Sequence, residues 1–159
     1  MVRKRQVLAG FATAFFLLLP ATSALAAPSR STAESSLLRA VNATRSAHGL
    51  RPLSLDPTLA RAARAHSLEM LRAGSFAHGD FRGRMMAFHA KGSFLGENLA
   101  WGSGSYATAS TVVREWLASP AHRANLLRPS YTRIGIGATQ GSFLGNDGST
   151  VVTADFAGR

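Results

Sequence analysis

The order of helical and strand patterns constrains the fold of this chain more than any other feature. Apolar residues recur at helical spacing in the earlier part, whereas alternating and β-branched residues occupy the end. We expect helices over residues 31–48, 57–73, 84–89, 106–118 and 121–127. We expect strands over residues 94–101, 132–139 and 150–156, the last two joined by a turn at 145–148. Helices that precede strands in this way indicate an α+β fold, in which helices pack on an antiparallel sheet.

The two longest predicted helices carry clear end signals. Ser31 and Glu34 form the S-x-x-E pattern of a capping box, and Gly49 suits the left-handed residue that follows a helix. Asp56 before Pro57 combines an N-cap carboxylate with a proline in the first turn. These signals place the helix ends independently of the apolar pattern.

The N-terminal segment reads as a secretory signal peptide. A basic start, M-V-R-K-R, precedes the apolar run V-L-A-G-F-A-T-A-F-F-L-L-L and the small-residue site Ala24-Leu25-Ala26. We expect cleavage after Ala26, a flexible leader over residues 27–34 and a single domain over 35–159; an uncleaved N-terminal anchor is the alternative. The mature protein is then secreted, extracellular or periplasmic.

Composition excludes several classes of function. The chain has no cysteine, which excludes disulfides, thiol nucleophiles and thiolate metal sites. Its formal charge is +10, carried almost entirely by scattered arginines without a long basic run. Export and the lack of a recognisable nucleic-acid motif argue against nucleic acid as a partner. A basic exported protein could adhere to anionic envelope polymers or lipid head groups, although a solvated basic surface explains the same composition.

One acidic residue stands out in the stretch G-E-N-L-A-W-G. Glu97 lies there among small and apolar residues, and a buried carboxylate is costly unless it is paired or hydrogen-bonded. Glu97 therefore either fixes the fold locally or holds a proton, a metal or a ligand.

The chain resembles the CAP superfamily of cysteine-rich secretory, antigen 5 and pathogenesis-related proteins, also called the SCP domain, in its bacterial secreted branch. The stretches that carry the resemblance are V-N-A-T-R-S-A-H-G-L-R-P-L, L-A-R-A-A-R-A-H-S-L-E-M, F-A-H, G-E-N-L-A-W-G, W-L-A-S-P-A-H-R-A-N-L-L and Y-T-R-I-G-I-G. They follow one another in family order over most of the mature chain. The resemblance implies a three-layer α-β-α sandwich with helices on both faces of the sheet.

The same resemblance implies a cleft formed by two histidines and two acidic residues, which binds a divalent metal in some members. His78 matches the first histidine, Glu97 the first acid and His122 the second histidine. Ser119 stands at the position of the second acid, so this chain departs from the family pattern. Glu115, one helical turn earlier, is a possible substitute, although a solvent-facing helix glutamate is the simpler interpretation.

Two imidazoles and one carboxylate form a legitimate ligand set for zinc or another divalent metal, bound weakly here because one acid is missing. Alternatively, His78 and His122 are cleft histidines that hydrogen-bond Glu97 without metal. His48 and His66 are expected to be packing residues. Ser119 is expected to cap a helix, and a Ser119–His122 nucleophile pair is a remote alternative.

These observations favour a secreted, non-enzymatic protein that binds a small apolar ligand, a lipid or sterol, or an envelope component through the His-Glu-His cleft. The alternative is a metal-assisted hydrolase of peptide, ester or phosphodiester bonds that uses the same cleft. An adhesive envelope protein with an inert cleft is a third hypothesis. Nothing in the sequence requires more than a monomer.

Overall fold

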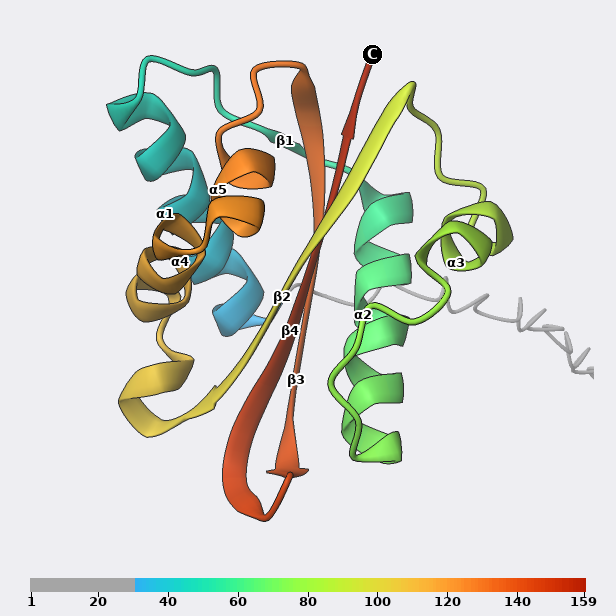
Figure 1. Ribbon diagram of the computed structural model, residues 1–159, viewed down its shortest axis with the longest axis vertical. Helices are drawn as coiled ribbons and strands as arrows, with labels where there is room; N and C mark the ends of the chain where they lie inside the picture. Colours follow the sequence, from blue (N-terminus) through green and yellow to red (C-terminus); the bar gives the residue numbers. More distant parts are fainter. Residues whose placement is uncertain (1–30) are drawn as a thin grey trace, which may run out of the picture.

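A computed structural model describes residues 31–159, so the predicted signal peptide and residues 27–30 of the leader lie outside the described residues. The described part confirms the α+β sandwich (Figure 1). A central sheet is seen nearly edge-on, with α1, α4 and α5 on one face and α2 and α3 on the other.

The helices and strands follow the predicted order. The helices are α1 Thr32–Ala47, α2 Pro57–Ala73, α3 Phe81–Ala87, the short 3-10 helix η1 Gly104–Ala107, α4 Ala109–Ala118 and α5 Pro120–Leu126. The strands are β1 Ser54–Leu55, β2 Phe94–Ser103, β3 Tyr131–Phe143 and β4 Asn146–Gly158.

The differences from prediction have local causes. The helix expected at 84–89 begins earlier, because Asp80 accepts a hydrogen bond from the Gly83 N–H and caps α3. The helix expected from Tyr106 begins at Ala109, because Thr108 caps it and η1 precedes it. The two-residue strand β1 was not predicted, since such a short segment has no periodicity to detect.

The strand order in the sheet is β1-β3-β4-β2. The long strands β3, β4 and β2 pair antiparallel, as predicted, whereas the short β1 adds to β3 in parallel. β2 is therefore an edge strand, and it lies in front in Figure 1.

Alternation along β3 explains how α2 reaches the sheet. Ile134 and Ile136 belong to the core on the α1 and α4 side. Gly135 and Gly137 face α2, and a Cβ atom on Gly135 would lie only 2.0 Å from the backbone carbon of Leu59. The I-G-I-G pattern thus builds a core on one face and lets a helix backbone rest against the other.

Separate apolar clusters fill the two faces of the sheet. The largest, which includes Val41, Trp116 and Phe156, packs α1, α4 and α5 on the strands. On the other face, one cluster includes Leu59 and Met85, and another includes Met70. No helix within residues 31–159 has the length and apolar character needed to cross a membrane.

Candidate functional site

The geometry of β2 places Glu97 against the end of β4. The Asn125 amide donates to the Glu97 carbonyl oxygen at 3.0 Å, and the Trp116 indole donates to the Leu99 carbonyl oxygen at 2.9 Å. These carbonyls therefore point away from β4, and Glu97 forms a non-hydrogen-bonded pair with Asp155. Side chains approach most closely in such pairs, so two carboxyl groups meet on the α2 and α3 face of the sheet.

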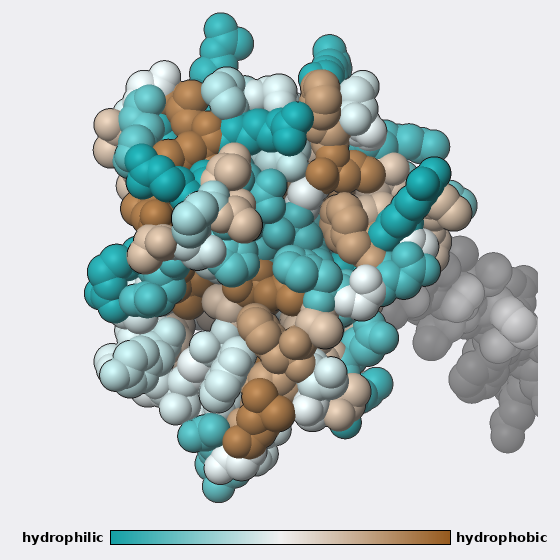
Figure 2. Space-filling model, viewed as in Figure 1, coloured by the Kyte–Doolittle hydropathy of each residue, from teal (hydrophilic) through white to brown (hydrophobic). Residues whose placement is uncertain are grey.

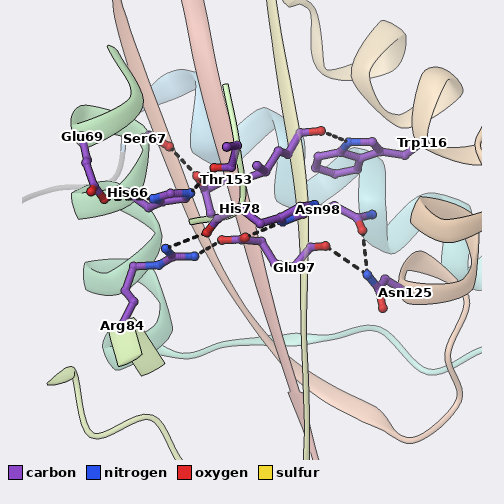
Figure 3. Close-up of polar contacts among 12 residues, drawn as sticks. His66, Ser67, Glu69, His78, Arg84, Glu97, Asn98, Trp116, Asn125 and Thr153 are labelled. Carbon is purple, nitrogen blue, oxygen red and sulfur yellow. Dashed lines mark hydrogen bonds and ion pairs between the residues drawn. The ribbon is translucent and has the colours of Figure 1, made fainter. Parts of the chain in front are cut away.

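Glu97 is held by one histidine and one arginine (Figure 3). His78 Nδ1 lies 2.7 Å from Glu97 Oε1, and Arg84 donates from Nη2 to Oε2. Arg84 also donates from Nη1 to the His78 carbonyl oxygen at 3.3 Å. The Glu97 side chain is 2% exposed and that of His78 is 55% exposed, so the pair runs from the interior to the surface.

Asp155 lies at the buried end of this group of side chains. It is 0% exposed, and neither of its carboxyl oxygens finds a hydrogen-bond donor among the described residues. Burial, followed by the charge of Glu97, raises the pKa of Asp155 well above its usual range, although Arg84 opposes the shift. Asp155 therefore keeps its proton to a higher pH than an ordinary aspartic acid does.

His122 lies on the opposite side of β2, at the start of α5. The Asn98 amide donates to the His122 carbonyl oxygen at 3.0 Å, and Asn125 in turn donates to Asn98 Oδ1. Burial, and secondarily the nearby charge of His78, lower the pKa of His122. A neutral imidazole at neutral pH is the result. Ser119 is the N-cap residue of α5, but its side chain makes no capping hydrogen bond.

A groove of about 340 Å³ adjoins His122 between β2, η1 and α4. It is lined by Phe76, Leu99, Ala100, Trp101, Tyr106, Val112, Glu115, Trp116, Ser119 and His122. Phe76 and Tyr106 are 41% and 71% exposed, so two aromatic side chains stand open to solvent there. Figure 2 shows this face of the molecule, with hydrophilic side chains near its centre and apolar ones below them.

The remaining predicted residues have varied surroundings. Glu115 reaches the rim of the groove, but its side chain is 65% exposed and pairs with Arg114. His66 is buried, as predicted, and its ring contacts the Glu69 carboxylate at 3.1 Å and the Ala77 carbonyl oxygen at 3.0 Å. His66 therefore ties α2 to the loop that carries His78. His48 is exposed rather than packed.

The arrangement does not fit a three-ligand metal site. Both oxygens of Glu97 are already occupied, one by His78 and the other by the positive charge of Arg84. Within residues 31–159, no group of three histidine or acidic side chains is placed to hold a metal ion. His78 and Glu97 are brought together, whereas His122 faces the groove beyond the strand.

Sequence reasoning missed Arg84, Asp155 and Phe76. Asp155 carries the same signal as Glu97, an isolated acid inside an apolar strand, and that signal could have identified it. Arg84 has no such signal in the sequence. Its contact with Glu97 depends on the path of the loop after α2, which a local pattern does not reveal. Phe76 is the first residue of the F-A-H stretch, two residues before His78, but it has no evident partner in the sequence.

Comparison with known proteins agrees with this fold. The pattern of the CAP family, described as "Cysteine-rich secretory protein family", matches residues 38–156, and the chain belongs to this family. The Bacillus subtilis proteins YkwD and YlbC are 36% and 33% identical over 121 and 113 residues, or 73% and 68% of this chain. The matched regions span only 46% and 32% of those proteins.

Solved structures show the same architecture. An extracellular SCP-domain protein from Bacillus anthracis matches with a TM-score of 0.69 and 25% identity, over 80% of this chain and 40% of its own. An outer surface protein from Borrelia burgdorferi matches with a TM-score of 0.66 and 21% identity, over 80% of this chain and 92% of its own. The second likeness shows the fold alone.

Proposed function

We propose that this protein is exported and binds a small apolar ligand, of the lipid or sterol class, without chemical conversion. One observation carries the proposal: the groove beside His122 has apolar and aromatic walls with a few polar groups along one side. Ligand sites for apolar molecules combine such walls with few orienting polar groups. The signal-like N-terminus supports export, as do two similar structures, one of an extracellular protein and one of an outer surface protein.

The polar groups at the groove suit a neutral head group. The lowered pKa of His122 keeps its imidazole uncharged at neutral pH, so it can accept or donate one hydrogen bond. Ser119 offers a hydroxyl that is not used to cap α5. A hydroxyl or protonated carboxyl head beside these groups leaves the apolar body of the ligand against Phe76 and Tyr106.

The test is saturable uptake of a fluorescent fatty acid and a fluorescent sterol by residues 27–159. Phe76→Ala and Tyr106→Ala should each weaken binding about tenfold, because each removes aromatic surface that the ligand covers. Both side chains are exposed in the free protein, so the fold should tolerate their loss.

Two matched variants control this test. Leu144→Ala removes an exposed apolar side chain from the β3–β4 turn and should leave binding unchanged. Ala33→Trp obstructs the separate hollow of about 280 Å³ between α1 and α4. If Ala33→Trp abolishes uptake and the Phe76 and Tyr106 variants do not, the ligand site is that hollow and the groove proposal is wrong.

The metal-assisted hydrolase has weaker support, because Glu97 would first have to leave Arg84. Zinc titration by calorimetry of the same protein separates the two functions. One-to-one zinc binding that both His78→Ala and His122→Ala abolish would favour the hydrolase. Lipid uptake that survives His78→Ala would favour non-enzymatic binding.

A further inference from the structure

A second surface lies away from the groove, at the end of the molecule where β2 begins and β4 ends. Phe94 opens β2, and both Phe94 and Tyr131 pair with Gly158 in β4. The segments 91–94 and 128–131 therefore flank the same strand end. We call Lys91, Arg123, Arg128 and Phe94 the basic end. The start of β2 and the end of β4 lie at the top of Figure 1, near the C-terminus.

Arg128 is pre-organised at the centre of the basic end. Its guanidinium carbon lies 4.6 Å from the centre of the Phe94 ring and 5.3 Å from that of Tyr131. Its Nε donates to the Ser130 hydroxyl at 3.0 Å, and the Arg128 residue is exposed to solvent. A guanidinium that lies over aromatic rings is a suitable partner for phosphate.

No ion pair within the described part of the chain neutralises the positive charge of the basic end. None of the ion pairs among residues 31–159 involves Lys91, Arg123 or Arg128. Arg133, whose guanidinium reaches the Lys91 carbonyl oxygen, is already paired with Asp56. Arg123 and Arg128 share a hollow of about 480 Å³ with Leu127 and with the prolines at the start of α5 and just after its end, and no acidic residue lines it.

Apolar side chains stand beside these charges. Phe94 is 40% exposed and Met86 is 64% exposed, and Met86 lines a hollow that also reaches Ser93, next to Phe94. Figure 2 shows hydrophilic side chains that project at the upper end of this face around apolar ones. Basic groups around exposed apolar side chains are typical of surfaces that lie on anionic bilayers.

We propose that the basic end docks on an anionic phospholipid bilayer. Lys91, Arg123 and Arg128 contact lipid phosphates, and Phe94 enters the boundary between head groups and acyl chains. The exposed apolar side chains favour a bilayer over a soluble anionic polymer, since a polymer offers them no apolar phase. This surface is separate from the ligand groove, so the two proposals stand or fall independently.

The test is co-sedimentation of residues 27–159, which include every described helix and strand, with vesicles of equal parts phosphatidylglycerol and phosphatidylcholine. The triple variant Lys91→Gln, Arg123→Gln, Arg128→Gln should bind about 100-fold more weakly, at about fivefold for each basic group near the surface. The matched triple variant Arg39→Gln, Arg72→Gln, Arg114→Gln changes net charge equally and should bind as the wild type does. Wild-type binding should fall as salt rises.

Phe94→Ser tests the choice of a bilayer and should weaken vesicle binding several-fold. Equal losses in the two triple variants would overturn the proposal, because net charge alone would then explain binding. It would also be overturned if Phe94→Ser bound vesicles normally and soluble polyphosphate bound the wild type as tightly as vesicles. The partner would then be a soluble phosphate polymer.

Discussion

At the scale of single residues, two carboxyl groups lie side by side in the interior, and a single arginine lies beside them. Arg84 and His78 both contact the Glu97 carboxyl group, whereas Asp155 has no hydrogen-bond donor of its own among the described residues. Two adjacent carboxylates with a single guanidinium would leave an unpaired buried charge. Protonation of Asp155 removes that charge. The protonated form is therefore favoured, which raises the pKa of Asp155.

The raised pKa of Asp155 predicts a loss of stability as pH rises. The folded state binds this proton more tightly than the unfolded state, so the contribution is complete below the ordinary pKa of 3.8 and disappears as pH rises through the raised value. Asp155→Asn replaces the neutral acid with a neutral amide of the same shape. The variant should show a flatter decline of the free energy of unfolding toward alkaline pH.

The measurement is urea unfolding of wild type and Asp155→Asn over a series of pH values. Asp147→Asn is the matched control, since Asp147 is exposed at the start of β4 and the substitution should leave the pH profile unchanged. His122 contributes with the opposite sign, because its lowered pKa removes stability as pH falls below about 6.5. An Asp155→Asn profile parallel to the wild type would contradict the account.

At the scale of elements, the sequence predicts most helices and strands because their signals are local. The capping box at Ser31 and Glu34 and the N-cap at Asp56 both appear in the structure as expected. The family resemblance likewise predicts that His78 and Glu97 belong to one cleft. Arg84 and Asp155 could not be assigned roles in the same way, since their contacts depend on the register of β2 on β4 and on the path of the loop after α2.

Arg45 shows how a single side chain joins elements that are distant in sequence. It is fully buried on α1, and its guanidinium donates to the carbonyl oxygens of Arg51, Leu126, Arg128 and Tyr131 at 2.9–3.2 Å. Burial lowers its pKa, but arginine remains charged. One donor group thereby fixes the end of α1 against the end of α5 and the start of β3.

Arg45→Lys should destabilise the fold by about 2–4 kcal/mol, because an ammonium cannot satisfy four carbonyls that are spread around a planar guanidinium. Urea unfolding measures the loss. Arg39→Lys, an exposed substitution on the same helix, is the control and should change stability by less than about 0.5 kcal/mol. Equal stability of the two variants would mean that water replaces the Arg45 contacts at no cost.

At the scale of the whole molecule, one sheet serves two cores. The strands present alternate residues to the two helical layers, so β4 contributes Val152, Ala154 and Phe156 to one face and Val151 and Ala157 to the other. Neither layer of helices keeps its apolar face covered without the sheet. The architecture therefore requires that both layers form and unfold together.

The two tryptophans test this cooperativity, because they lie on opposite faces of the sheet. Trp116 belongs to the core beneath α1 and α4, whereas Trp101 packs edge-on against Phe143 at 5.4 Å in the cluster on the α2 side. Trp101→Phe leaves fluorescence that reports one layer, and Trp116→Phe leaves fluorescence that reports the other. Each variant should unfold with coincident midpoints by fluorescence and by far-ultraviolet circular dichroism.

Trp116→Phe should unfold at lower denaturant overall, because it loses the hydrogen bond to the Leu99 carbonyl. Separate midpoints within one variant would show that a helical layer detaches before the sheet unfolds. The groove between β2 and α4 would then open as a unit, without global unfolding.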